Sequence, residues 1–146
     1  MVKQLPSKKT IVLIGSKSGT TRTAETLEST YDSSTDYSFE VGGYNRLNMD
    51  VLYTTGATET NNTIEIKIDV SNDGTNYYRL VNESASSGTS TLFQREFTFT
   101  GAVASTVYDF SIIMDINYKF MKVEAKETGV VSNKGTCYIE ATLGVT

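Results

Sequence analysis

The chain of 146 residues contains no histidine and no tryptophan, and it has a single cysteine and a single proline. Without histidine, a Ser-His-Asp triad, a histidine-ligated zinc site and an imidazole proton shuttle are all excluded. Cys137 has no partner for an internal disulfide, and its neighbours Tyr138 and Ile139 indicate a small buried side chain. The longest apolar run near the start, Ile11–Ile14, is too short for a secretory signal or a membrane span, so we expect no membrane partner.

An excess of positive charge is also missing. Thirteen basic and 17 acidic residues give a net charge of −4, which leaves no excess of Lys and Arg to neutralise phosphates. We therefore expect no nucleic-acid partner. The length is suited to one domain with a single core.

Alternating apolar and polar residues are what the sequence does have, and residues 63–81 show them best. Ile64, Ile66, Ile68 and Val70 alternate with charged and polar residues, as in a strand with one buried face. The alternation stops at Asn72-Asp73-Gly74 and an apolar run resumes at Tyr77. Asp-Gly between two such runs predicts a β-hairpin.

Six further alternating stretches follow the same pattern, at 37–41, 47–53, 92–99, 107–116, 118–127 and 136–143. With turn signals every ten to fifteen residues, they predict an all-β, antiparallel β-sandwich, jelly-roll-like, with eight to nine strands. Gly42-Gly43 is interpreted as a turn or bulge between two paired strands, and 82–90 as a loop. Phe93, Phe97 and Phe99 are expected to face the core, and Glu124 and Glu127 to lie on exposed strand faces.

The N-terminal quarter differs from the rest. Residues 1–35 are interpreted as an N-terminal arm and long loop with one short strand at 10–14, and residues 36–146 as the β-sandwich domain. Residues 15–35 have only Leu27 and Tyr31 as large groups to bury, with room for one helical turn near 24–29. Such long loops are often functional, so we expect this one to contact a neighbouring subunit.

Two segments resemble the sequence motifs of known binding sites. Ser16, Ser18, Gly19, Thr20 and Thr21 follow a strand and resemble the phosphate-binding segment of sugar isomerase domains. That family needs alternating helices and parallel strands, whereas residues after Asp36 read as consecutive strands. The glycine loop also lacks the Gly-Lys-Ser or Gly-Lys-Thr ending of a nucleotide P-loop.

Asp69, Ser71, Asp73 and Gly74 match the first half of an EF-hand calcium loop, but Leu80 occupies the position of the bidentate glutamate. Asp73 is better explained as a turn former. We therefore expect no catalytic residue, no cofactor or cofactor-binding residue and no metal ligand, and the chain is not predicted to be an enzyme.

Nine tyrosines offer a second type of surface, because flat amphipathic rings can stack on sugars. Tyrosine is also common on sheet surfaces in general, and this interpretation is preferred. A glycan ligand at Tyr77 or Tyr78 remains the alternative.

Two stretches carry a family resemblance. Residues 68–77, IDVSNDGTNY, and residues 118–124, YKFMKVE, together resemble a strand pair common in small β-sandwich virion proteins of tailed bacteriophages. A similar pair occurs in discoidin-like carbohydrate-binding sandwiches. The resemblance covers about residues 63–143, and it departs from many relatives at Tyr77, where a tryptophan is usual, which weakens the inference of sugar stacking.

The resemblance implies a structural virion protein, of the capsid decoration or auxiliary head type, that stabilises the shell by subunit-subunit contacts. Its implied partners are the major capsid protein or other virion subunits, with a homo-oligomer expected. Its implied location is the virion, assembled in the host cytoplasm. A carbohydrate-binding adhesion domain and a tail or head-tail connector component are the alternatives.

Overall fold

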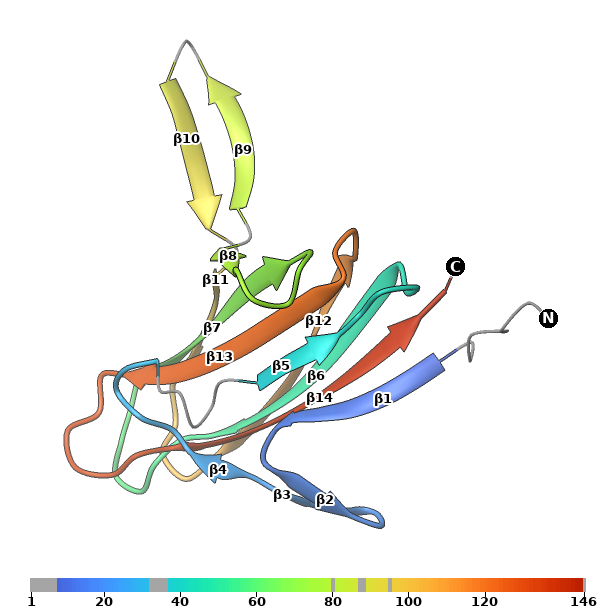
Figure 1. The fold of residues 1–146 in the computed structure, drawn as a ribbon. Helices are drawn as coiled ribbons and strands as arrows, with labels where there is room; N and C mark the ends of the chain where they lie inside the picture. Colours follow the sequence, from blue (N-terminus) through green and yellow to red (C-terminus); the bar gives the residue numbers. More distant parts are fainter. Residues whose placement is uncertain (1–7, 32–36, 80, 87–88, 95, 146) are drawn as a thin grey trace.

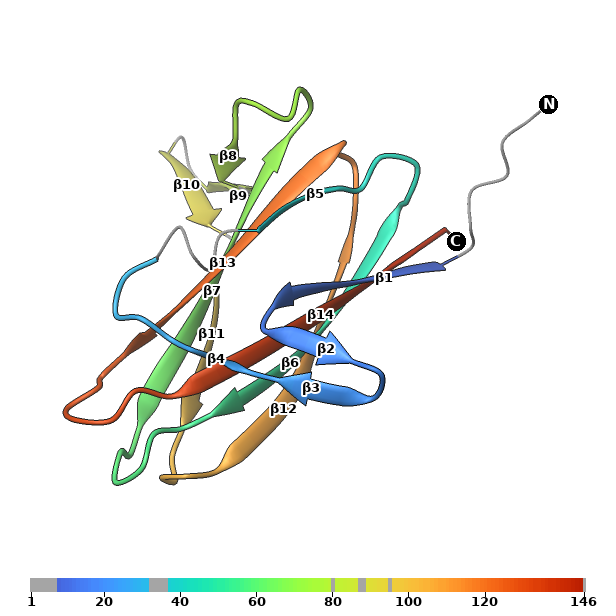
Figure 2. The same ribbon diagram turned by 60° about the horizontal axis from the view of Figure 1, so that its bottom comes forward.

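The computed structural model describes residues 8–31, 37–79, 81–86, 89–94 and 96–145. These residues form two packed antiparallel sheets with no helix among them, which confirms the predicted all-β sandwich (Figures 1 and 2). None of the described segments is a helix that could cross a membrane.

Each sheet has a main path of four strands. The first sheet has the order β1-β14-β6-β12, from β1 (Lys8–Ile14), β14 (Thr136–Gly144), β6 (Arg46–Thr54) and β12 (Val107–Asp115), and the short strand β4 (Glu25–Thr26) also pairs with β14. The second sheet has the order β11-β7-β13-β5, from β11 (Glu96–Gly101), β7 (Asn62–Ser71), β13 (Phe120–Thr128) and β5 (Tyr37–Glu40), and β8 (Tyr78–Arg79) also pairs with β7.

Most connections cross from one sheet to the other. The chain changes sheets between β5 and β6, between β6 and β7, and at each step from β11 to β14. The prediction that Gly42-Gly43 joins two paired strands is therefore wrong, because β5 pairs with β13 and β6 pairs with β12 and β14. These crossovers produce the jelly-roll-like arrangement.

The core lies between the sheets, and the alternation of the sequence predicts its members correctly in most strands. The side chains of β7 that point inward, Ile64, Ile66 and Ile68, are fully buried. They face Val51, Tyr53 and Ile139 of the first sheet within the same core, and Cys137 is buried as expected. Phe97 and Phe99 pack against this core but stay partly exposed, and the side chain of Phe93 lies outside the described residues.

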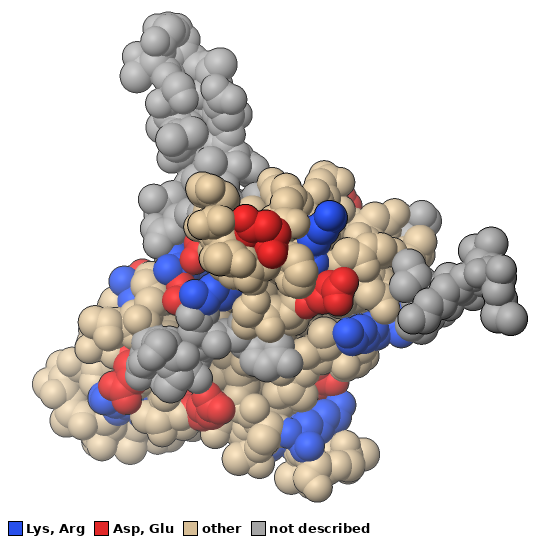
Figure 3. Space-filling view, viewed as in Figure 1, with Lys and Arg blue, Asp and Glu red and all other residues tan. Residues whose placement is uncertain are grey.

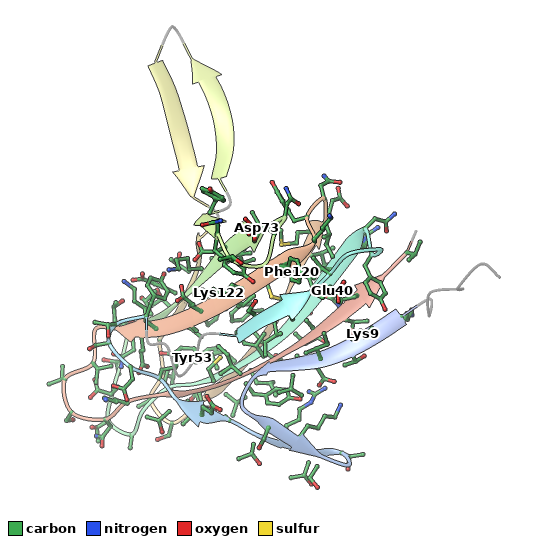
Figure 4. The ribbon with its side chains drawn as sticks, in the orientation of Figure 1. Lys9, Glu40, Tyr53, Asp73, Phe120 and Lys122 are labelled. Atoms are coloured by element: carbon green, nitrogen blue, oxygen red, sulfur yellow. The ribbon has the colours of Figure 1, made fainter. Side chains whose placement is uncertain are left out.

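The turn at the end of β7 has the predicted geometry. Gly74 adopts a φ of 76°, and a Cβ there would lie 3.2 Å from the ring of Phe120, so a side chain would be both strained and crowded. Figure 4 shows Asp73 and Phe120 at this end of the sandwich. The returning strand β8 pairs with β7 over only two positions.

The N-terminal segment contains more strand than expected. Lys8 and Lys9, predicted as part of an arm, pair with Gly144 and Leu143 in the first sheet. Residues 15–26, predicted as loop with an optional helical turn, form the hairpin β2 (Ser16–Ser18) and β3 (Thr21–Thr23) and the strand β4. Residues 1–7 lie outside the described part, and the boundary of the sandwich domain at residue 36 stays a prediction.

Candidate interaction surfaces

The most distinctive feature is a hairpin in place of the loop expected at 82–90. Strands β9 (Val81–Ser86) and β10 (Thr89–Gln94) pair with each other over six positions and form a sheet of their own. The predicted strand 92–99 is thus divided, since its first part belongs to β10 and its second part to β11. Figure 1 shows this hairpin, drawn in yellow and yellow-green, projecting away from the sandwich.

Strand registers show that the hairpin interrupts one edge of the second sheet. Before it, Arg79 pairs with Asp69 of β7; after it, Glu96 pairs with Lys67 of the same strand. Strands β8 and β11 therefore continue each other along one side of β7. Only one residue is needed to join them in register, opposite Ile68. Strands β9 and β10, which lie between them in the chain, are not part of the second sheet.

Strand β12 provides a second candidate, because it is an open edge. Among the described strands it pairs only with β6, through nine residues in unbroken register. Its side chains Val107 and Ile113 are 61% and 60% exposed. A long regular edge strand with exposed apolar residues is a template for pairing with another chain.

Residues 15–35 are predicted to contact a neighbouring subunit, and their described part, residues 15–31, packs on its own chain. Glu140 of β14, 6% exposed, is bound by Lys17 at 2.8 Å, by Arg22 at 3.5 Å and by the Tyr138 hydroxyl at 2.9 Å. These donors lower the pKa of Glu140, with the Lys17 bond as the main cause. The β2–β3 hairpin is thus held over the outer face of the first sheet.

The same segment then bridges the two sheets. The buried Leu27 donates its N–H to Gly135 O, and Glu28 O accepts the N–H of Glu127 on β13. Tyr31 continues over the second sheet, where the ammonium groups of Lys67 and Lys126 each lie 4.7 Å from its ring centre. The segment closes one side of the sandwich.

The outer face of the second sheet carries paired charges. Lys67 lies between Glu124 and Asp69, and Lys126 binds Glu65 at 3.1 Å. The prediction that Glu124 lies on an exposed face is wrong, because it is 8% exposed. The view in Figure 3 shows basic and acidic groups interspersed, without a surface of one sign.

Glu127 departs furthest from its predicted exposed position, because its side chain is fully buried between the sheets. Its Oε1 accepts the Tyr53 hydroxyl at 2.5 Å, and its Oε2 accepts the N–H of Gly135 at 2.6 Å. A Cβ on Gly135 would lie 2.6 Å from the backbone oxygen of Thr54 and 2.6 Å from Oε1 of Glu127, so this position requires glycine. The alternation along β13 indicates that Glu127 points inward, because residue 127 is in phase with the inward residues Met121, Val123 and Ala125.

Three loops are tied together at the end of the sandwich where β6 enters β7. Glu59 accepts the backbone N–H groups of Val131, Ser132 and Asn133 at 3.0, 2.5 and 2.8 Å. These bonds lower the pKa of Glu59 to about 2. In the third loop, Thr106 N donates to Thr55 Oγ1 at 3.1 Å. This end is fixed by loop-to-loop hydrogen bonds.

The two segments that resemble binding-site motifs form a hairpin and a turn in the structure. Ser16–Thr21 lies within the exposed β2–β3 hairpin, and the described residues after it include no helix that could present N–H groups to a phosphate. Asp73 accepts the N–H groups of Thr75 and Asn76, both at 2.8 Å, and the side chain of Asn76, which lowers the pKa of Asp73. Both carboxylate oxygens accept hydrogen bonds from residues of the turn, as in an Asx turn.

No cluster of three or more His, Cys, Asp or Glu side chains suited to a metal ion occurs within the described residues.

The two tyrosines named as candidates for glycan binding differ in exposure. Tyr77 is half-buried, with its hydroxyl hydrogen-bonded to Ser38 and Lys122 over its ring at 5.6 Å. Tyr78 is 70% exposed.

These elements define the class of the protein as a β-sandwich with a projecting hairpin and an open sheet edge. No protein-family model and no curated protein matches the chain. Among solved structures, the crystal structure of the SPBc2 prophage-derived protein YomS is similar, with a TM-score of 0.44 and 18% sequence identity over 98% of this chain and 97% of that chain.

Proposed function

We propose that this protein is a structural virion protein of a tailed bacteriophage, of the capsid decoration or auxiliary head type, that works by adhesion and without catalysis. The observation that carries the proposal is the projecting hairpin β9–β10, which pairs with no other described strand. A two-stranded hairpin standing alone in water is marginally stable, so a third strand or a packed surface from a neighbour stabilises it. Contact with a neighbour is the role expected of a shell-stabilising subunit.

The rest of the sandwich supports this use. The core and the bridging segment at Leu27–Tyr31 make a compact body, so that the hairpin is presented from a rigid base. Backbone pairing by an added strand gives affinity without a preformed pocket. The major capsid protein or another virion subunit is the proposed partner, and the virion the proposed location.

A deletion tests the proposal sharply. Removing residues 81–95 leaves Leu80 as the single residue between Arg79 and Glu96, which restores one continuous edge strand opposite Asp69, Ile68 and Lys67 in the observed registers. We expect this variant to fold and to fail to co-sediment with purified shells that lack the protein, whereas the full chain binds. Binding by the deletion variant equal to that of the full chain would contradict the role of the hairpin. Failure of the full chain to bind any head, tail or connector preparation would contradict the proposed function.

Exposure of Tyr78 beside the Asp73 turn favours a second candidate, a carbohydrate-binding adhesion domain. A glycan array separates the two functions. Specific sugar binding that is lost in Tyr78→Ala and kept in Tyr118→Ala would support the adhesion domain. Binding to shells without binding to any glycan supports the structural role.

A further inference from the structure

We infer that the hairpin β9–β10 of one subunit pairs with the open edge of β12 in a second copy of this chain, and that the exchange is reciprocal. This inference rests on the proposed function and names a second copy of this chain as the virion subunit that the hairpin contacts. Among the described elements that lack a neighbour on one side are the hairpin, which pairs with no other strand, and β12, which pairs only with β6. Pairing between the two would give each of them the neighbouring strand that it lacks.

Their positions on the subunit allow a closed pair. The hairpin leaves the second sheet at the edge formed by β8 and β11, and β12 is the edge of the first sheet on that same side. The Phe99 ring of β11 lies 5.2 Å from Tyr108 and 5.0 Å from Phe110 of β12, which places the two edges next to each other. A two-fold axis on this side lets each hairpin reach the β12 of the other copy, as a symmetric dimer requires.

The lengths and the surfaces match as well. Each hairpin strand has six residues, and β12 offers nine in unbroken register. Other described edges offer less: β1 has seven residues with a register shift between Val12 and Ile14, β5 has four residues, and β11 has six and lies next to the base of the hairpin. Within 81–94 the sequence has one charged residue, Glu83, so that little charge opposes pairing with a strand that exposes Val107 and Ile113.

Two complementary variants test the exchange. One is the deletion of residues 81–95, which removes the hairpin and keeps β12. The other is the double substitution Val107→Lys and Ile113→Lys, which keeps the hairpin and places lysines on the β12 edge, where natural edges use them to prevent pairing. The control is Val131→Lys, at a loop position that is 90% exposed and belongs to neither element.

Mass measurement by light scattering should show a dimer for the full chain and for the control, and a monomer for each of the two variants alone. An equimolar mixture of the two should recover a heterodimer through the single intact contact. In the full chain, hydrogen exchange at β12 amides should be about tenfold slower or more than in the deletion variant. Full-length protein that is monomeric, or a lysine double variant that still dimerises, would overturn the exchange. If the full chain is monomeric and still binds shells, the exchange is wrong while the proposed function stands.

Discussion

Tyr53 and Glu127 join the two sheets from inside the core, with the tyrosine hydroxyl 2.5 Å from Oε1 of the carboxylate (Figure 4 labels Tyr53). Both side chains are fully buried. A buried carboxylate is tolerated only when its oxygens are hydrogen-bonded, and here Tyr53 and Gly135 N satisfy one oxygen each. The pair fixes how β6 of one sheet lies against β13 of the other.

Tyr53→Phe should therefore lower the free energy of unfolding by about 1–3 kcal/mol, because it leaves Oε1 of a buried carboxylate without its main donor. Urea unfolding measures the change. A double-mutant cycle with Glu127→Gln isolates the pair, and additive effects of the two substitutions would contradict their coupling.

Alkaline conditions test the same pair through Tyr53. Burial, followed by the hydrogen bond to Glu127, raises the pKa of Tyr53 above its ordinary value of 10.0. Above pH 10 the unfolded chain loses this proton while the folded chain keeps it, so stability is full below pH 10 and falls as the pH rises further. We expect Tm to drop less between pH 9 and pH 11 in Tyr53→Phe than in the wild type. An equal drop would mean that Tyr53 titrates normally.

At acid pH the loop cluster around Glu59 should weaken. Three backbone N–H groups lower the pKa of Glu59 from 4.5 to about 2. Its contribution to stability is present above pH 4.5 and is lost as the pH falls toward 2. Glu59→Gln should lower Tm at pH 6 and reduce the further loss on going to pH 3. Thermal melts of the wild type and of Glu59→Gln across this pH range measure the difference, and an equal loss in the two would contradict the role of Glu59.

Attachment of the N-terminal segment to the sandwich depends on Glu140. Glu140→Gln removes the charge that holds Lys17 and Arg22, which are trypsin sites. We expect cleavage after these residues to become about tenfold faster at a temperature where the sandwich stays folded, because local opening governs such cleavage. Unchanged cleavage would show that β4 pairing alone holds the segment.

Core packing gives the largest single effect. Ile66→Ala removes a fully buried side chain and should cost about 2–5 kcal/mol of unfolding free energy. Val131→Ala, at a 90% exposed position, is the matched control and should be near neutral. A near-zero effect at Ile66 would contradict the inward phase of β7.

Sequence alone predicted the class of fold and the phase of most strands, because alternation such as that of Ile64, Ile66 and Ile68 reports directly which face is buried. It did not predict which strands pair. Gly42-Gly43 breaks a strand equally well in a hairpin and in a crossover between sheets, so local residues cannot distinguish the two.

The candidate surfaces were harder to predict. Residues 82–90 are rich in Ser and Gly, a composition typical of loops, and nothing local indicates that they form a hairpin standing off the sheet. Glu127 was assigned to solvent because it is charged, although its parity with Val123 and Ala125 places it inward. Charge outweighed periodicity in that prediction, and the partners Tyr53 and Gly135, which make burial possible, are distant in the sequence.

The most direct test of the central claim is a density map, at a resolution that shows strands, of phage particles assembled with this protein. We expect the sandwich on the particle, with the hairpin β9–β10 paired against a strand of a neighbouring subunit. Particles that assemble without the protein in them, or a map in which the hairpin touches no neighbour, would contradict it.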